Sequence, residues 1–378
     1  MELTIQKTDL LDGLQMAQGI VEKKSAMPIL SNVLIETADE GINLVATDLQ
    51  VGLRFHCPAV VTQPGGITVL ARKFYEIIRE LPEEEIYLKL KENNRLFISC
   101  KGIQYHLVGL PVLDFPALPE TDQNQMITLE GADIREMIQK TIISISLEDT
   151  RYNLSGIYFE YVNDEENRHT LRMISTDGHR LSLIDKKIEP LIEGTFSQGV
   201  LLPRKAVSEL LKILDKPGSI RLGFKENNGI IVKDNILIIM RLLDRKFPDY
   251  HLVLPKKKDK TLLLPKNSLL DAMRRMAVLS TEKYKGIKLL LKKGGLEILS
   301  INPEIGDAKE EISLDYKGEK MDIGFNPRYF IDALLVMNSE KITLELSDAV
   351  SPAVLSGEKD PGYLALIMPM KVFEETQN

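Results

Sequence analysis

The sequence has 378 residues, of which 44% are hydrophobic and 27% charged, and its formal net charge is −7. This composition is ordinary for a folded globular protein and excludes a disordered chain, a collagen and a small disulfide-rich scaffold. The length is enough for two or three domains. No apolar run approaches the ~20 residues of a membrane-spanning helix, and no basic-then-apolar leader opens the chain. The sequence therefore predicts a cytoplasmic protein that does not bind a membrane.

The sequence contains no recognisable metal or cofactor motif. Cys57 and Cys100 are its only cysteines, and none of its five histidines has the spacing of a metal-binding pair. Glycine-rich phosphate loops and the nucleophilic serine motif of hydrolases are absent from the sequence as well. The sequence therefore predicts no metal, no cofactor and no catalytic residue.

Six segments along the chain join a short apolar strand to apolar residues at helical spacing, which predicts a strand followed by an amphipathic helix. In chain order the segments are 3–17, 66–81, 127–141, 199–214, 262–276 and 322–337. In the second, fourth and sixth, an arginine stands at the start of the helix. These residues are Arg72, Arg204 and Arg328, which lie 132 and 124 residues apart. The similar spacing predicts one structural unit repeated three times.

The helices of the first, third and fifth segments are expected to begin near polar residues. Side chains at the start of a helix accept hydrogen bonds from N–H groups that have no partner within the helix. The candidates for this capping are Thr8, Gly131 or Asp133, and Asn267 or Ser268.

Alternating apolar and polar residues between the helices predict antiparallel strands, as in 171–176, 180–185 and 341–346. Each repeat then holds two helices and about eight short strands, with the helices on one face of the sheets. The predicted fold class is α+β. Polar stretches at 120–125 and 255–260 are expected to join the repeats. The predicted domains are 1–124, 125–258 and 259–378.

Residues 176–180 are the one cluster that resembles an active site. Asp177 and His179 suggest an acid–base pair, and a small-molecule enzyme that uses them with Arg180 is one alternative function. An Asp-Gly pair between two alternating runs is, however, the strongest short-range signal of a β-hairpin, and no nucleophile accompanies it. A turn that presents its side chains for binding is the favoured interpretation.

Charge is unevenly distributed along the chain. Counted over 9–24, 72–80, 133–140, 204–216, 266–275 and 327–338, the predicted helices carry +4, which leaves −11 for the remainder. This distribution is expected of a protein whose helices meet a polyanion such as DNA while its sheets face solvent. Lysine and arginine are also good helix formers, which explains part of the difference. A scaffold that does not bind DNA is therefore a second alternative.

Short motifs spread over the whole chain resemble those of a known family. They are MPILSNV (27–33), ARKF (71–74), TDGHRL (176–181), RKFPDY (245–250) and IMPMKV (367–372). In this order and spacing they resemble the bacterial DNA polymerase III beta subunit, the replicative sliding clamp. The resemblance implies a non-enzymatic processivity factor, formed by two three-domain chains that join head to tail in a six-domain ring around duplex DNA.

The resemblance also implies partners and sites. Duplex DNA would be bound irrespective of its sequence. The DNA polymerase III alpha subunit, clamp loader subunits and other clamp-binding replication and repair proteins would bind a cleft between the second and third domains. The residues that match this cleft are Leu154, Thr176, Gly178, His179, Arg180, Leu181, Pro248, Val253, Val350, Leu366, Met368, Pro369 and Met370. The expected DNA contacts are Lys24, Arg72, Lys73, Arg151, Tyr152, Arg204 and Lys205. The expected dimer interface contains Tyr105, Leu107, Val278 and Leu279.

The chain departs from the family pattern in two places. It continues from Phe373 to Asn378 beyond the point where the family usually ends, and Tyr152 is followed by Asn153 where the family often has a second aromatic residue. Removal of the tail is expected to change peptide binding little. Without the resemblance, IMPM at 367–370 would be interpreted as a last edge strand that covers a core.

Overall fold

The structure is a computed structural model, and it describes residues 1–22, 26–119, 126–148, 150–163, 169–189, 199–254 and 259–371. These residues form two compact units. As far as they are described, unit 1 consists of Met1–Ile134 and Lys205–Leu242, and unit 2 of Arg135–Leu191, Gln198–Arg204 and Leu243–Asn378. The middle repeat contributes to both units, because some of its strands pair with strands of the first repeat and others with strands of the third.

Unit 1 contains one sheet of 13 strands in the order β10-β15-β16-β17-β4-β3-β2-β6-β9-β8-β7-β1-β5, and its pairs are antiparallel. The strands of the first repeat are β1 (Glu2–Gln6), β2 (Asn32–Ala38), β3 (Gly41–Thr47), β4 (Val51–Pro58), β5 (Val60–Gln63), β6 (Gly66–Leu70), β7 (Glu85–Lys91), β8 (Arg95–Cys100) and β9 (Ile103–Leu110). The strands of the middle repeat in this unit are β10 (Ile127–Glu130), β15 (Ser219–Lys225), β16 (Asn228–Lys233) and β17 (Ile236–Arg241).

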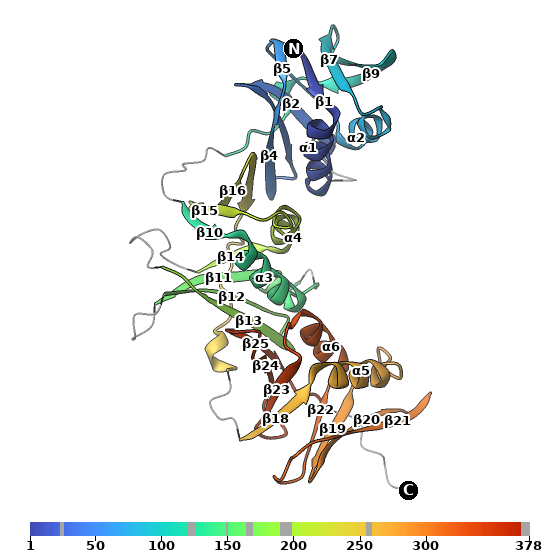
Figure 1. The fold of residues 1–378 in the computed structure, drawn as a ribbon, viewed down its shortest axis with the longest axis vertical. Helices are drawn as coiled ribbons and strands as arrows, with labels where there is room; N and C mark the ends of the chain where they lie inside the picture. Colours follow the sequence, from blue (N-terminus) through green and yellow to red (C-terminus); the bar gives the residue numbers. More distant parts are fainter. Residues whose placement is uncertain are drawn as a thin grey trace. The chain divides into compact units, whose positions relative to one another are not determined.

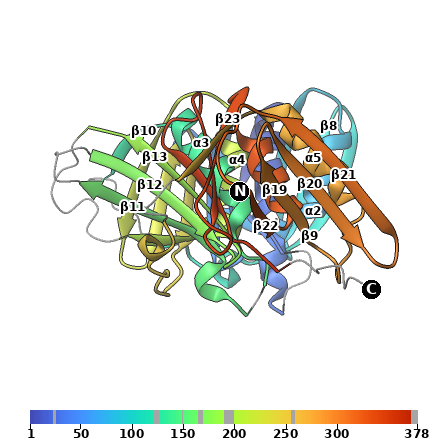
Figure 2. The same ribbon diagram turned by 90° about the horizontal axis from the view of Figure 1, so that it is seen from below.

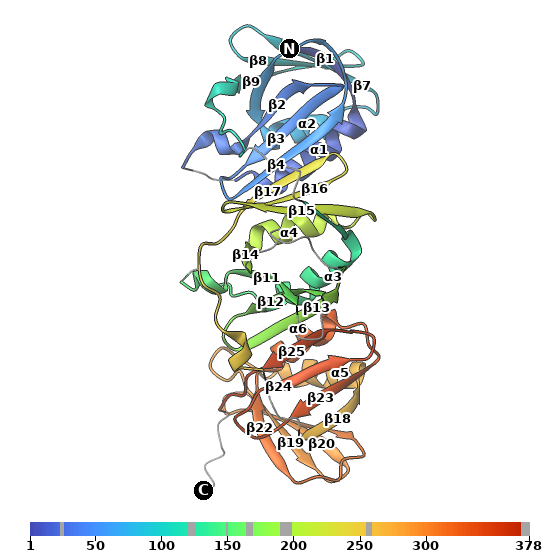
Figure 3. The ribbon, with the colours of Figure 1, turned by 90° about the vertical axis from the view of Figure 1, so that its left-hand side faces the viewer.

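Two helices of the first repeat pack on one face of this sheet, behind β2, β3 and β4 as seen in Figure 3. α1 (Lys7–Ile20) buries Leu10 and Leu14, which lie on the same side of the helix because they are four residues apart. α2 (Ala71–Glu80) buries Phe74 and Ile78, which are also four residues apart, and packs against α1. The buried face of each helix is therefore the one that the sequence pattern predicts.

Unit 2 contains an eight-stranded and a four-stranded sheet. The larger sheet has the order β14-β11-β12-β13-β25-β24-β23-β18. Its strands are β11 (Gly156–Asn163), β12 (His169–Thr176), β13 (Arg180–Lys187), β14 (Val200–Pro203), β18 (Lys260–Pro265), β23 (Lys341–Leu346), β24 (Ala353–Gly357) and β25 (Tyr363–Ile367). The smaller sheet has the order β21-β20-β19-β22, formed by β19 (Ile287–Lys292), β20 (Gly295–Asn302), β21 (Gly306–Ser313) and β22 (Met321–Phe325).

The remaining helices belong to the middle and third repeats. α5 (Lys266–Ala277) and α6 (Pro327–Val336) lie side by side (Figure 1), and α5 packs on β20 and β21 (Figure 2). α3 (Gly131–Thr141) and α4 (Arg204–Ile213) belong to the middle repeat. All six predicted helices and the antiparallel strands are thus confirmed, and the fold is α+β with three repeats.

The capping predictions are wrong. All five candidate residues lie inside helices, because α1 begins at Lys7, α3 at Gly131 and α5 at Lys266. The residues before α1 and α5, Gln6 and Pro265, make no side-chain capping bond. Each of these helices follows its strand without a loop, so the last strand residue occupies the capping position.

Some predicted features lie outside the described residues. These are the stretch 120–125, most of 255–260, the tail from Phe373 to Asn378, and Lys24. Within the described part of the chain, no helix combines the length and the apolar character needed to cross a membrane.

Candidate functional site

The cluster 176–180 forms the turn of a hairpin between β12 and β13. Oδ1 of Asp177 accepts hydrogen bonds from the backbone N–H groups of His179 (2.9 Å) and Arg180 (3.0 Å). Gly178 has a φ angle of +87°, a conformation that favours glycine. The Asp177 carboxylate therefore holds the turn together and is not arranged as the orienting partner of a catalytic histidine ring. The hairpin prediction is confirmed.

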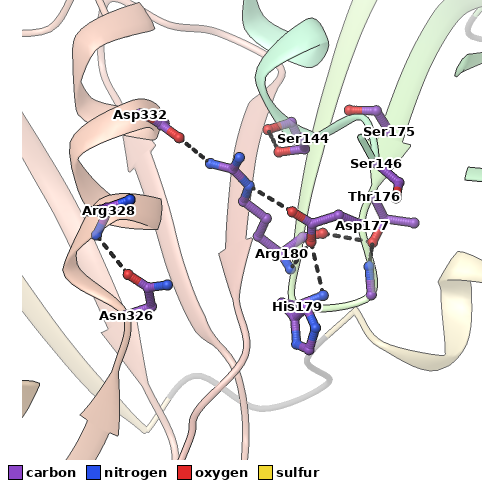
Figure 4. A network of polar contacts seen from close by, with 12 residues as sticks. Ser144, Ser146, Ser175, Thr176, Asp177, His179, Arg180, Asn326, Arg328 and Asp332 are labelled. Carbon is purple, nitrogen blue, oxygen red and sulfur yellow. Dashed lines mark hydrogen bonds and ion pairs between the residues drawn. The ribbon is translucent and has the colours of Figure 1, made fainter. Parts of the chain in front are cut away.

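Arg180 connects this turn to helix α6, as Figure 4 shows. Its Nε lies 3.1 Å from Oδ2 of Asp177, and its Nη1 lies 2.5 Å from Oδ2 of Asp332 on α6. The guanidinium carbon also lies 4.7 Å from the centre of the Tyr329 ring. The His179 ring stacks on the same tyrosine, with 6.5 Å between the centroids. Only 14% of the Arg180 side chain is exposed. Two carboxylates and an aromatic ring thus hold it in one orientation.

A cleft of about 160 Å³ lies beside this turn in unit 2. Leu154, Leu181 and Leu366 line it and belong to a buried cluster on the eight-stranded sheet. The more exposed Pro248 and Val253 also line it. Pockets that combine many apolar groups with a few fixed polar ones are typical binding sites. This cleft has both features, since Arg180 and the turn supply the polar groups.

The backbone near the C-terminus positions Met368 in the cleft lining. β25 pairs with β13, and the hydrogen bonding continues past the end of β25, where the N–H of Met368 donates to the carbonyl of His179 at 2.9 Å. The N–H of Met370 donates to the carbonyl of Gly324 at 2.9 Å. β25 lies between β13 and β24, so its interpretation as an edge strand is wrong. The C-terminal run is instead an interior strand that leads into the cleft.

Two aromatic residues fix the RKFPDY segment against the sheet. Phe247 stacks on Tyr158 with 5.0 Å between ring centroids and 2° between the planes. The hydroxyl of Tyr250 donates to Oε1 of Glu160 (2.5 Å) and accepts from Nη1 of Arg172 (2.9 Å). Burial and the hydrogen bond to Glu160 raise the pKa of the Tyr250 hydroxyl above its usual value, which stabilises the protonated, donating form.

Most of the predicted cleft residues meet at this place. Those that line the cleft are Leu154, Thr176, Gly178, Arg180, Leu181, Pro248, Val253, Leu366 and Met368. Those outside the lining are His179, Val350, Pro369 and Met370. The sequence prediction missed Phe247, Asp249 and Tyr250. The RKFPDY motif contains all three, and the Phe-Pro pair that recurs at 115–116 and 247–248 was a further signal.

The predicted DNA contacts differ in the ion pairs that they form within the protein and in how exposed those pairs are. Arg72 and Lys73, at the start of α2, are largely exposed and both pair with Glu76, at 2.9 and 2.7 Å. Exposed pairs of this kind are weak and leave the cations accessible to other anions. Lys205 instead pairs with Asp48, whose side chain is 4% exposed. Its ammonium group therefore neutralises a buried carboxylate within unit 1.

Three further predicted DNA contacts belong to the middle repeat, where Tyr152 and Arg204 are exposed and Arg151 is partly exposed. Tyr152 is exposed in the 3-10 turn Tyr152–Leu154, and Arg204 is exposed at the start of α4. Arg151 precedes that turn, and its Nη1 donates to the carbonyl of Asp177 at 2.7 Å. This side chain is thus in contact with the cleft hairpin.

Within the described residues, the four predicted dimer residues lie near two strand edges that have no partner strand. β9, which carries Tyr105 and Leu107, pairs with β8 along its length but with β6 only at 109–110. In unit 2, β21 is an end strand of its sheet. Val278, 78% exposed, and Leu279 directly follow α5, which packs on β21. Unpaired edges of this kind readily pair with another chain.

A second hollow, of about 370 Å³, lies in unit 1. It is formed by the turn after β3, the segment 116–119 and the turn between β15 and β16. Gln50, Asn228 and Arg241 give it a largely polar wall, and it contains no predicted site residue. The cleft in unit 2, with its buried leucines and its fixed arginine, is the stronger candidate.

Family models match the chain in three consecutive parts. The N-terminal domain of the DNA polymerase III beta subunit matches residues 1–119, the central domain 128–249 and the C-terminal domain 251–371. The beta sliding clamp of Pseudomonas putida is 37% identical over 379 residues, which cover 98% of this chain and 100% of the relative. The beta sliding clamp of Escherichia coli is 34% identical over 375 residues, with the same coverage.

Solved structures give the same result. The sliding clamp of Bartonella birtlesii bound to griselimycin has a TM-score of 0.93 at 32% identity, covering 98% of this chain and 100% of that one. The DNA polymerase III subunit beta of Pseudomonas aeruginosa has a TM-score of 0.91 at 33% identity, with the same coverage. The similarity therefore extends over nearly the whole chain and all three repeats.

Proposed function

The chain belongs to the DNA polymerase III beta subunit family, and from this membership we propose that it forms a closed ring of two chains around duplex DNA. As a beta sliding clamp it is a non-catalytic processivity factor built of three clamp domains. Two findings carry the proposal. The three clamp-domain models match the chain one after another, and the whole chain superimposes on a solved sliding clamp with a TM-score of 0.93. We take 1–124, 125–258 and 259–378 as these domains and the cytoplasm as the place of action.

The ring is a head-to-tail dimer in this proposal. The free edge of β9 in one chain would pair with the free edge of β21 in the other. Tyr105 and Leu107 would then meet Val278 and Leu279, which covers exposed apolar side chains on both partners. A contact between two different surfaces closes into a ring when its rotation is suitable.

DNA is held by topology together with weak phosphate contacts. Arg72, Lys73, Arg151, Arg204 and Lys24 carry the positive charges that we assign to this role. Contacts to phosphates position a protein on DNA without reading the base sequence. Exposed pairs such as that of Arg72 with Glu76 can exchange their carboxylate for a phosphate at little cost, which suits a protein that slides.

The cleft in unit 2 is the proposed site for partner proteins. A short segment with a polar residue followed by apolar anchors would place its anchors on Leu181, Val253 and Met368. Its backbone would meet the polar groups of the 176–180 turn. We assign the alpha subunit of DNA polymerase III, clamp loader subunits and other clamp-binding replication and repair proteins to this cleft. Methionine adapts to ligands of several shapes, so one cleft can serve many partners.

Retention on DNA of different topology tests the proposal. The protein is placed on nicked circular DNA, half of the sample is cut once to linear form, and both halves are passed through a sizing column in moderate salt. A ring remains with the circle and slides off the line. A protein held only by charge leaves both forms as the salt concentration rises, and that result would contradict the ring. Sedimentation equilibrium on the free protein must also give the mass of two chains.

A further inference from the structure

One short segment carries residues of both proposed sites. In 148–154, Arg151 and Tyr152 are assigned to DNA, while Leu154 lines the partner cleft. The N–H of Leu154 donates to the carbonyl of Arg151 at 2.9 Å, which closes the 3-10 turn between them. The N–H of Ser146 in turn donates to the carbonyl of Leu154 at 3.0 Å. These two bonds connect the backbone of Arg151 to Leu154 in the cleft lining.

The side chain of Arg151 reaches the cleft hairpin directly. Its Nη1 donates to the carbonyl of Asp177 at 2.7 Å. A Cβ atom on residue 178 would lie only 3.0 Å from the same nitrogen, so the guanidinium packs against the turn in space that Gly178 leaves open. The hairpin that presents Arg180 and Leu181 to the cleft is thus supported by Arg151.

The guanidinium of Arg151 keeps capacity for a further acceptor. Its Nε lies 2.9 Å from Oε2 of Glu148, and the side chain is 39% exposed. A guanidinium has five N–H groups, and among the residues that the structure describes the contacts to Glu148 and Asp177 use two of them. The other three suit a phosphate, which guanidinium groups bind with paired hydrogen bonds.

We propose that Arg151 couples the two sites, so that DNA bound by Arg151 tightens the binding of partner peptides in the cleft. The inference rests on the proposed function. A partly exposed arginine loses rotamer freedom when it is held against Asp177. When a phosphate binds first and immobilises Arg151, its binding free energy already includes this loss of side-chain entropy. A peptide that binds afterwards, and that needs an ordered hairpin, then loses less entropy and binds more tightly. The coupling is reciprocal: a bound peptide favours the phosphate contact by the same factor.

The test measures peptide affinity with and without DNA. A fluorescent peptide with a polar residue followed by apolar anchors is titrated with the full-length dimer by anisotropy, alone and with a saturating short duplex at low salt. Sedimentation of the same samples measures how much DNA is bound. We expect roughly 5-fold tighter peptide binding on DNA, at the low end of couplings between distinct sites. Arg151→Ala should weaken peptide binding without DNA and abolish the response to DNA. Arg151→Lys should recover part of the peptide affinity that Arg151→Ala loses.

The control is Arg72→Ala, which removes another proposed DNA contact at the start of α2 in unit 1. It should leave peptide affinity without DNA unchanged and keep the 5-fold response once the duplex is saturating. Equal peptide affinity with and without bound duplex, or wild-type behaviour of Arg151→Ala, would overturn the coupling alone. A wild-type protein that binds neither duplex nor peptide would overturn the proposed function as well.

Discussion

Lys140 and Asp360 form a buried ion pair although 220 residues separate them: Nζ lies 2.7 Å from Oδ1, and the side chains are 1% and 0% exposed. Lys140, on α3, also lies 2.6 Å from Oε1 of Glu136. Asp360 accepts the backbone N–H groups of Asn338 (2.8 Å) and Ser339 (2.9 Å). The charges are thus paired and hydrogen-bonded, as buried ions must be. The pair ties the middle repeat to the third within unit 2.

Removal of one partner should therefore destabilise unit 2 strongly. Lys140→Met leaves Asp360 charged and buried without its cation, and loss of one member of such a pair costs about 3–5 kcal/mol. Calorimetry should show the transition of unit 2 at a clearly lower temperature. Lys359→Met is the matched control, since Lys359 pairs with Glu340 on the surface, where an ion pair is worth about 0–1 kcal/mol. Equal melting temperatures for the two variants would contradict the assignment.

The same pair makes unit 2 sensitive to acid. Burial alone would raise the pKa of Asp360, but hydrogen bonds from Asn338, Lys140 and Ser339 outweigh it and lower the pKa below its usual value. A carboxyl group with a lower pKa in the folded state contributes stability above its unfolded pKa, and this stability is lost as pH falls through the folded pKa. The melting temperature of unit 2 should therefore fall steeply below about pH 4. Asp360→Asn should be less stable at pH 7 and show a flatter decline; parallel curves would contradict this origin.

The features that the sequence predicted correctly are those that depend on residues close together in the chain. The six helices follow from apolar spacing within single segments, and the turn at Asp177 and Gly178 follows from an Asp-Gly pair between alternating runs, the strongest short-range signal of a hairpin. The helix starts were predicted one to three residues too late, because Gln6 and Pro265 end their strands and also occupy the capping positions directly before α1 and α5. The residue types alone do not show whether the position before a helix is taken by a polar capping residue or by the last residue of a strand.

The pairing between repeats could not be predicted from local patterns. β17 pairs with β4, and β13 pairs with β25, so the middle repeat is divided between two units. Ile236–Met240 carried one relevant signal, because a continuous apolar run is typical of a strand buried on both faces. Phe247 and Tyr250 were missed in the cleft for a similar reason: their partners Tyr158 and Glu160 lie about ninety residues earlier.

Lys205 and Arg72 should respond differently to removal. Asp48, the partner of Lys205, also accepts the N–H groups of Gln50 (2.9 Å) and Val51 (2.6 Å) in a buried turn. Lys205→Ala removes the cation from this carboxylate and should destabilise unit 1 by about 1–3 kcal/mol. Arg72→Ala removes only an exposed pair and should change stability by less than about 0.5 kcal/mol.

Measurements of retention on DNA distinguish a variant that has lost a phosphate contact from a variant that has lost stability. Arg72→Ala should reduce retention on nicked circles modestly and equally for all base sequences, because it removes a phosphate contact. Lys205→Ala should reduce retention chiefly above its lowered melting temperature. Equal thermal stability of the two variants, measured by circular dichroism, would show that the Asp48 pair contributes nothing.

The dimer should depend on Val278 and Leu279. Replacement of both by Ala removes five carbon atoms, and at about 0.8 kcal/mol per buried carbon each interface weakens by up to about 4 kcal/mol. A head-to-tail ring of two chains contains this interface twice, so the loss counts twice. Sedimentation should show a monomer. Val60→Ala, an exposed valine on the edge strand β5, is the control and should remain dimeric; a dimeric double variant would place the interface elsewhere.

The last prediction concerns Met368 and Met370, two methionines that are two residues apart in the C-terminal run. Met368 lines the cleft, whereas Met370 lies outside it. Met368→Ala should lose about 1–3 kcal/mol of peptide binding, because the apolar surface that covers the peptide anchor shrinks. The dimer should persist, because Met368 belongs to the cleft and not to the proposed interface. Hot spots of this kind usually concentrate binding energy in a few buried anchors.

Met370→Ala is the matched control, since it removes the same atoms two residues away. Its backbone N–H still donates to the carbonyl of Gly324, so the path of the chain is kept. Titration calorimetry with a peptide that has a polar residue and apolar anchors should give near wild-type affinity for this variant. Equal losses in both variants would mean that the C-terminal run acts through its overall packing. Full-strength binding to Met368→Ala would mean that partners bind somewhere other than the cleft of Leu154, Leu181 and Leu366.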